Sequence, residues 1–201
     1  MSRIKATLRG KSYVERSIDT KAVRKRFLIV CEGEKTERNY FRRFRVPGKI
    51  IDVKGIGFNT ISLVKEALNL RVKAEYDQVW CVFDRDSFPA QNFNAALNLA
   101  ASKGIEVAYS NEAFELWYLL HFDYHHAGIT RKAYIEILER KLGHTYEKNS
   151  EFMFDELESK IQIAIRNAQR LLENYVPRHP ERDNPSTTIH LLVEELLKSS
   201  S

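Results

Sequence analysis

Apolar residues gather in four short runs that alternate with longer amphipathic stretches over the first 125 residues. The runs at 27–31, 49–54, 79–83 and 104–109 have the length and content of β-strands, and each is followed by a predicted helix: around 38–45, 60–74, 90–102 and 111–122. The run at 79–83 contains no polar residue, which is typical of a strand covered on both faces of a parallel sheet.

This alternation predicts the fold class. Four strand and helix pairs with long crossovers indicate a doubly wound α/β protein with a mainly parallel, four-stranded sheet, and we expect the first and third strands to be neighbours. After Thr130 the pattern predicts helices only, at about 130–142, 151–175 and 186–198. The predicted organisation is a basic N-terminal arm (1–25), an α/β core (26–125) and a helical extension packed on the core (126–201).

Composition narrows the class of protein. The chain has 201 residues with 43% hydrophobic and 29% charged residues, enough for one sizeable core with an appendage. No apolar run approaches eighteen residues and the N-terminus has no apolar signal segment, so we expect no membrane span, no secretion and a cytoplasmic location. Cys31 and Cys81 lie in predicted strands, as reduced core residues do. The net charge of +5 is compatible with a nucleic-acid partner.

Acidic residues follow two of the predicted strands. Asp84 and Asp86 come directly after the third strand, and Glu32 follows the first. If those strands are neighbours, the three carboxylates face one another at the carboxyl edge of the sheet, where open α/β sheets bind ligands. Oxygen ligands of this kind suit Mg²⁺ or Mn²⁺. The alternative is a turn in which Asp84 or Asp86 caps the next helix.

Other motifs point less clearly to chemistry. The glycines at 55 and 57 lack the third glycine of a dinucleotide fingerprint and the lysine of a P-loop, so a turn capped by Asn59 or Thr60 is the expected structure. His121, His125 and His126 with Asp123 have a spacing that zinc could use, but ordinary helix-end and loop histidines are favoured. Receiver domains and haloacid-dehalogenase-type phosphatases also carry acids at this edge, in positions that fit this sequence less well.

Four segments together resemble a known family. The strand ending in Glu32-Gly33 and the strand ending in Asp84-x-Asp86 resemble the Toprim signature of topoisomerases, primases and OLD-type nucleases. More closely, the chain is similar to the RloB-like family over about residue 24 to its end, in segments 30–37 (VCEGEKTE), 83–86 (FDRD), 114–122 (FELWYLLHF) and 184–187 (NPST). The resemblance implies a Toprim-like core and metal-dependent phosphodiester chemistry.

The resemblance also implies roles. Glu32 would be the general acid/base or a metal-bridging residue, and Asp84 and Asp86 would be ligands of Mg²⁺ or Mn²⁺. Glu37 corresponds to a second acid of OLD-like nucleases, although here it is one residue further along. RloB-like proteins are associated with abortive infection and antiphage defence, commonly beside an ABC- or AAA-type ATPase, and related Toprim effectors cleave nucleic acid, including transfer RNA.

Basic residues near the acids complete the expected site. Lys35, Arg38 and Arg85 are the nearest candidates to position substrate phosphates. Glu115 is expected to orient a metal ligand from the start of the helix after the fourth strand. The leading hypothesis is therefore a metal-dependent nuclease acting on RNA or DNA; the alternative is a non-catalytic module that binds nucleic acid or an ATPase partner.

Overall fold

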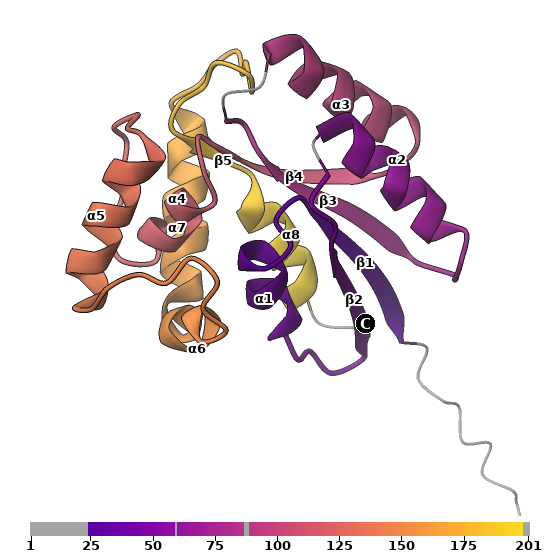
Figure 1. The fold of residues 1–201 in the computed structure, drawn as a ribbon, viewed down its shortest axis with the longest axis horizontal. Helices are drawn as coiled ribbons and strands as arrows, with labels where there is room; N and C mark the ends of the chain where they lie inside the picture. The colour runs from indigo at the N-terminus through magenta and orange to yellow at the C-terminus, as the bar shows by residue number, and fades with distance from the viewer. Residues whose placement is uncertain (1–23, 59, 87–88, 199–201) are drawn as a thin grey trace, which may run out of the picture.

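The protein folds around one five-stranded sheet (Figure 1). The structure is a computed structural model that describes residues 24–58, 60–86 and 89–198. Its elements are, in chain order, β1 (Lys25–Cys31), α1 (Thr36–Arg42), β2 (Lys49–Gly55), α2 (Thr60–Arg71), β3 (Gln78–Asp84), α3 (Ala90–Ser102), β4 (Glu106–Asn111), α4 (Glu115–Leu120), α5 (Arg131–Leu142), α6 (Met153–Leu157), a 3₁₀ turn (Glu158–Lys160), α7 (Ile161–Glu173), β5 (Ser186–Thr187) and α8 (Ile189–Leu197).

The strand order β2-β1-β3-β4-β5 confirms that the first and third strands are neighbours. Strands β1 to β4 are parallel, as expected for βαβ units. Side chains alternate between the two faces of a strand. Along β1, Leu28 and Val30 therefore pack against α2 and α3, while Phe27, Ile29 and Cys31 pack on the other face. Figure 1 shows α2 and α3 on one side of the sheet and the remaining helices on the other.

The prediction of a four-stranded sheet was wrong, because β5 adds a fifth strand antiparallel to β4. The predicted helix at 186–198 begins only at Ile189. Thr188 N donates to Tyr109 O (2.8 Å) and Tyr109 N donates to Thr188 Oγ1 (2.9 Å). Two residues of strand leave no periodic signal in the sequence, and hydroxyl side chains complete their pairing.

Two further predicted helices differ from the observed ones. Ser110 and Asn111, expected to cap a helix at 111–122, are the last residues of β4, and α4 covers only Glu115–Leu120. The predicted helix at 151–175 is broken by the 3₁₀ turn. Its buried residues Leu157, Ile161 and Ile165 keep a four-residue spacing across the break, which is why the sequence pattern looked continuous.

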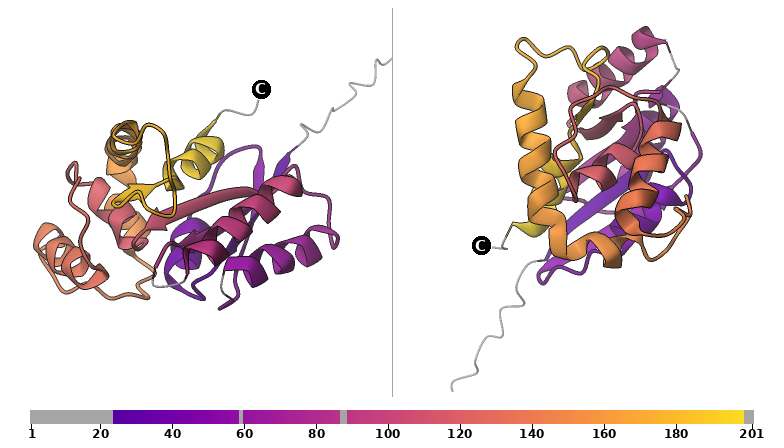
Figure 2. Two further views of the ribbon diagram at one scale, coloured as in Figure 1. Left: turned by 90° about the horizontal axis from the view of Figure 1, so that it is seen from above. Right: turned by 90° about the vertical axis from the view of Figure 1, so that its left-hand side faces the viewer.

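Of the helices after residue 130, α8 packs against β4, α7 packs against α4, β5 and α8, and α5 packs against α4. They share the larger apolar cluster, which includes Leu138, Ile165 and Leu192. At the start of β2, the Lys49 amino group donates to three backbone carbonyls near the end of α8. Figure 2 shows α7 and α8, in orange and yellow, in two views rotated by 90° from that of Figure 1. The division at residues 125 and 126 stays a prediction, and the predicted arm lies almost wholly in residues 1–23, outside the described residues.

Two simpler expectations can be compared directly with the structure. Cys31 and Cys81 are buried and not bonded to each other. No helix within the described ranges is both long and apolar enough to cross a membrane.

We predict that Thr187→Val destabilises the protein by about 1–3 kcal/mol, because it leaves buried polar groups that now bind the Thr187 hydroxyl without a hydrogen-bond partner. The Thr187 hydroxyl donates to Tyr109 O (3.0 Å) and lies 3.0 Å from Ser110 Oγ. Urea denaturation measures the change. Thr145→Val, at an exposed position, is the matched control and should stay within about 0.5 kcal/mol of wild type. Equal free energies of unfolding for the two variants would contradict a stabilising role for the β5 pairing.

Candidate functional site

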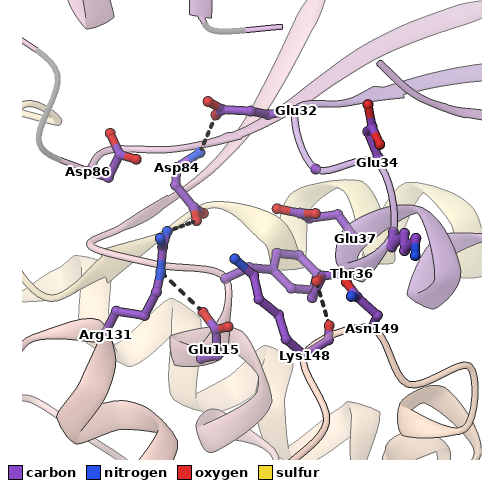
Figure 3. A pocket seen from close by; sticks show the side chains of 13 residues that line it. Glu32, Glu34, Thr36, Glu37, Asp84, Asp86, Glu115, Arg131, Lys148 and Asn149 are labelled. Carbon is purple, nitrogen blue, oxygen red and sulfur yellow. Dashed lines mark hydrogen bonds and ion pairs between the residues drawn. The ribbon is translucent and has the colours of Figure 1, made fainter. Parts of the chain in front are cut away.

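A pocket of about 370 Å³ opens at the carboxyl edge of the parallel strands (Figure 3). The ends of β1 and β3, helix α1, the start of α4, the first residue of α5 and the loop between α5 and α6 all contribute to it. Its lining residues are Glu32, Gly33, Glu34, Lys35, Thr36, Glu37, Asp84, Asp86, Phe114, Glu115, Arg131, Lys148 and Asn149.

The three acids predicted to converge all line this pocket. Parallel pairing places them there: Glu32 N donates to Val82 O (2.8 Å), which continues the β1–β3 ladder by one residue. Asp84 N in turn donates to Glu32 Oε2 (3.3 Å). Glu32 and Asp84 therefore lie at the ends of adjacent strands, and Asp86 is two residues further along the loop after β3 (Figure 3).

Glu37 reaches the same pocket from the first turn of α1. Its carboxylate lies so close to Gly33 that a Cβ built on Gly33 would come within 1.9 Å of Glu37 Oε2. Any side chain at position 33 would displace the Glu37 carboxylate from this position, so the glycine allows Glu37 to lie where it does. Glu37 is 6% exposed, and within the described part of the chain its Oε2 atom has no hydrogen-bond partner.

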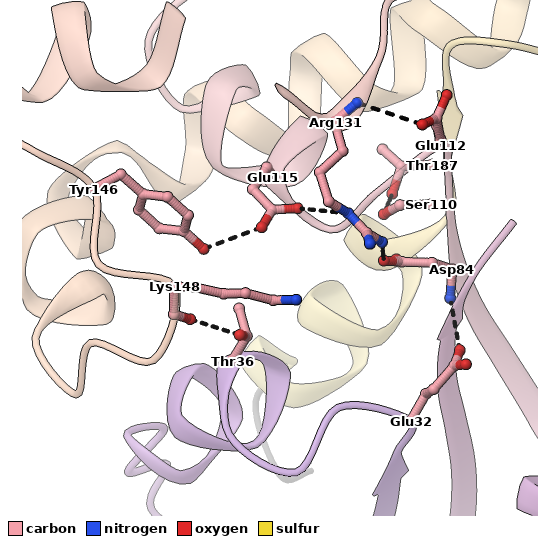
Figure 4. A network of polar contacts seen from close by, with 10 residues as sticks. All are labelled: Glu32, Thr36, Asp84, Ser110, Glu112, Glu115, Arg131, Tyr146, Lys148 and Thr187. Atoms are coloured by element: carbon pink, nitrogen blue, oxygen red, sulfur yellow. Dashed lines mark hydrogen bonds and ion pairs between the residues drawn. The ribbon is translucent and has the colours of Figure 1, made fainter. Parts of the chain in front are cut away.

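Sequence reasoning missed Arg131, which bridges two of the acids (Figure 4). Its Nη2 atom lies 2.7 Å from Asp84 Oδ2 and its Nε atom 3.7 Å from Glu115 Oε2. Its backbone N also donates to Glu112 Oε1 (3.4 Å). The Thr130 side chain caps α5 by accepting from Ala133 N, so Arg131 is the first residue of that helix. The only local signal in the sequence was that Thr130 could cap a helix. That signal does not indicate that Arg131 contacts Asp84, which is far away in the sequence.

The loop between α5 and α6 was also missed. Thr36 Oγ1 donates to Lys148 O (2.5 Å), and Asn39 Nδ2 donates to Asn149 O (3.0 Å). Tyr146, two residues earlier, donates from its hydroxyl to Glu115 Oε1 (3.3 Å). These three contacts tie the loop to α1 and to Glu115, and Lys148 and Asn149 of the loop line the pocket. Glu115 therefore lies between Arg131 and Tyr146, and its orienting role stays a prediction.

The three predicted phosphate-binding residues separate in space. Lys35 lines the pocket, whereas Arg38 and Arg85 are not among its lining residues. The Arg85 guanidinium donates to Glu181 O (3.2 Å) and to Asp86 O (2.5 Å). It also lines a neighbouring cavity that shares Asp86 with the acid pocket.

The histidines considered for zinc do not gather at this pocket. His121 directly follows the last residue of α4, which is the helix-end position expected for it. It is also buried, with its ring nitrogens 2.9 Å from Trp117 O and 3.4 Å from the Tyr40 hydroxyl.

Burial and mutual repulsion dominate the electrostatics of the acids. Burial, reinforced by the charges of Asp86 and Glu37, raises the pKa of Glu32 to about 7, although the hydrogen bond from Asp84 N opposes the shift. Burial and the charge of Glu37 raise the pKa of Asp84 well above its usual range despite Arg131. The pKa of Glu37 is raised by burial and by Glu115. The pocket therefore has a deficit of positive charge.

The ligand types fit a hard divalent cation, because every acid offers carboxylate oxygens and Glu37 Oε2 has no partner. The positions fit less completely. Among residues 24–58, 60–86 and 89–198, no three His, Cys, Asp or Glu side chains form a ready-made metal cluster. The Asp84 carboxylate already forms an ion pair with Arg131, so a cation that binds here would have to compete with Arg131 for it.

These features define a class: an α/β protein with a mostly parallel sheet and a carboxylate-lined pocket at its carboxyl edge. Comparison with protein families makes the assignment specific. The model of the family described as RloB-like protein matches residues 27–196, so the chain belongs to the RloB-like family, as its motifs suggested. Searches of curated proteins and of solved structures returned no match.

We predict that Glu32 makes stability depend on pH when cations are removed by chelation. Its folded pKa of about 7 exceeds the ordinary 4.5, so its contribution is fully present below about pH 4.5 and is lost as the pH rises through 7. Relative to Glu32→Gln, wild type should gain about 1–2 kcal/mol between pH 8 and pH 4.5, a figure reduced for solvent screening. Chemical denaturation at a series of pH values measures this difference. Parallel pH curves would contradict the raised pKa.

Proposed function

We propose that this protein is a metal-dependent nuclease of the Toprim type, which hydrolyses phosphodiester bonds in RNA or DNA with Mg²⁺ or Mn²⁺. The observation that carries the proposal is the convergence of Glu32, Asp84 and Asp86 in one pocket at the ends of adjacent parallel strands. Membership of the RloB-like family supports it, since three of the four segments that carry the resemblance contribute lining residues to this pocket.

Each acid has a role that suits its surroundings. Glu32, with a pKa of about 7, can accept a proton from water near neutral pH and return it to a leaving oxygen. Asp84 and Asp86 would hold the cation, and Glu37 and Glu115 would complete or orient its ligands. When bound, the cation supplies Lewis acidity, which favours negative charge on the scissile phosphate and deprotonation of the attacking water.

We further propose the biological setting implied by the resemblance. The protein would act in the cytoplasm as a toxic effector of antiphage defence, with an ABC- or AAA-type ATPase partner controlling its activity. Transfer RNA is one candidate among the RNA and DNA substrates.

One observation favours a second candidate, a non-catalytic module that binds nucleic acid or the ATPase. The ion pairs of Arg131 with Asp84 and Glu115 already satisfy part of the acidic cluster without a metal. A pocket stabilised internally in this way could serve as a binding surface alone.

The decisive test is cleavage of labelled RNA and DNA by the purified protein, alone and with the ATPase, in Mg²⁺, Mn²⁺ or chelator. We expect metal-dependent cleavage that falls about 10²–10⁴-fold in Glu32→Gln and Asp84→Asn, since the first removes the proposed proton acceptor and the second a proposed ligand of the cation. Glu75→Gln, an exposed acid away from the pocket, is the control and should cleave like wild type. Wild-type rates in Asp84→Asn would reject its role, and no cleavage in any condition would favour the binding module.

Metal binding can be tested without a substrate. Mg²⁺ or Mn²⁺ should raise the melting temperature of wild type, because a ligand at 100 times its dissociation constant stabilises by about 2.7 kcal/mol. We expect a smaller rise for Asp86→Asn. Asp155→Asn removes an acid that pairs with Arg43 outside the pocket and should respond like wild type. Equal shifts in all three proteins would mean that Asp86 is not a ligand.

A further inference from the structure

Negatively charged side chains outnumber positively charged ones around the pocket. Six carboxylates line it, but only three cations, Lys35, Arg131 and Lys148. Arg131 is engaged by two of the acids, Asp84 and Glu115. A negatively charged substrate entering this pocket needs a positive group that the acids do not already hold.

Lys148 meets that need. Its side chain extends into the pocket toward the carboxylates (Figures 3 and 4). It is nevertheless an exposed residue. Its charge lowers the pKa of Glu37, but among the described residues the ion pairs of this pocket are made by Arg131 and not by Lys148. A lysine that only neutralised the acids would close onto one of them, as Arg131 does with Asp84.

The backbone that carries Lys148 is fixed. Thr36 binds the carbonyl of Lys148 itself, Asn39 binds that of Asn149, and the Tyr146 hydroxyl reaches Glu115. Two of these anchors lie on α1 and one on α4. The loop is therefore tied to both walls of the pocket, and an exposed lysine is presented over the acids from a backbone that costs little to order on binding.

A second observation indicates that a ligand is expected at this place. Glu37 is only 6% exposed, and its Oε2 atom lacks a hydrogen-bond partner within the described ranges. An unsatisfied buried carboxylate oxygen costs free energy unless a ligand completes its contacts. Lys148 and Glu37 face the same cavity, which can thus receive positive charge at the acids and negative charge at the lysine.

We propose that Lys148 is a substrate-binding residue, whose amino group contacts a phosphate oxygen of the nucleic-acid backbone while the acids hold the divalent cation. This inference rests on the proposed nuclease function and deepens it: the helical part of the chain, through the loop between α5 and α6, supplies the phosphate contact. The earlier candidates Arg38 and Arg85 lie outside the pocket lining, so Lys148 takes the place expected for them.

The test is binding rather than cleavage. The affinity of the full chain for fluorescein-labelled single-stranded RNA and DNA is measured by anisotropy in Ca²⁺, at several salt concentrations. We expect Lys148→Gln to weaken binding about threefold to tenfold for all sequences and to reduce the salt slope by about 0.7–1, as loss of one phosphate contact does. Lys148→Arg should retain most of the affinity. Lys132→Gln is the matched control on the neighbouring helix, where Lys132 is 88% exposed, and it should bind like wild type.

Three results would overturn the inference. One is an unchanged affinity and salt slope in Lys148→Gln. Another is tighter metal binding in that variant with unchanged oligonucleotide binding, which would make Lys148 a counter-ion of the acids. The third is binding of inorganic phosphate that depends on Lys148 without any binding of oligonucleotide, which would indicate a small anion as the ligand. Equal melting temperatures of the two lysine variants verify that folding is intact.

The binding assay separates this inference from the proposed function. Oligonucleotide binding that depends on Lys148, without cleavage by wild type in any metal, would support the phosphate contact and reject the nuclease. Metal-dependent cleavage with identical affinities for wild type and Lys148→Gln would support the nuclease and reject the phosphate contact.

Discussion

Parallel pairing of β1 with β3 is the constraint on which the rest of the site depends. The register brings the end of each strand to one edge, and the last ladder bond, from Glu32 N to Val82 O, sets Glu32 beside Asp84. Both strands are buried on both faces. Their positions are therefore held by apolar packing on two sides, and the acids are placed by a part of the molecule that does not need them for its stability.

Three of the thirteen residues that line the pocket, Arg131, Lys148 and Asn149, come from segments outside the βαβ core. Arg131 reaches Asp84 and Glu115 from the start of α5, and the loop carrying Lys148 is hydrogen-bonded to α1. The helices after residue 130 thus do more than cover one face of the sheet. They contribute positive charge to an acidic edge and close one side of the cavity, so the pocket exists only when the two parts of the chain pack together.

The features of the fold and pocket that could be predicted are those that depend on the order of apolar and polar residues over a few neighbouring positions. Apolar runs predicted β1 to β4, and acids following two of them predicted the convergence of Glu32 with Asp84 and Asp86. Arg131 and Lys148 could not be predicted, because their contacts depend on how helices far along the chain dock, which leaves no periodic trace. The short strand β5 was missed for a related reason. It has only two polar residues, which pair with Ser110 and Asn111 of β4 and form no apolar run.

The energetics of the pocket argue that it is built for a ligand rather than for stability. Burying acids together raises the pKa values of Glu32, Glu37 and Asp84, so each one opposes folding while it is charged. Replacing a buried ionic cluster by apolar residues of similar volume is often neutral or stabilising, so such a cluster is weak evidence of a stabilising role. The backbone is nevertheless shaped to keep the cluster, since Gly33 leaves the space that the Glu37 carboxylate fills. An arrangement that costs stability and yet has its own backbone support is best explained by what it binds.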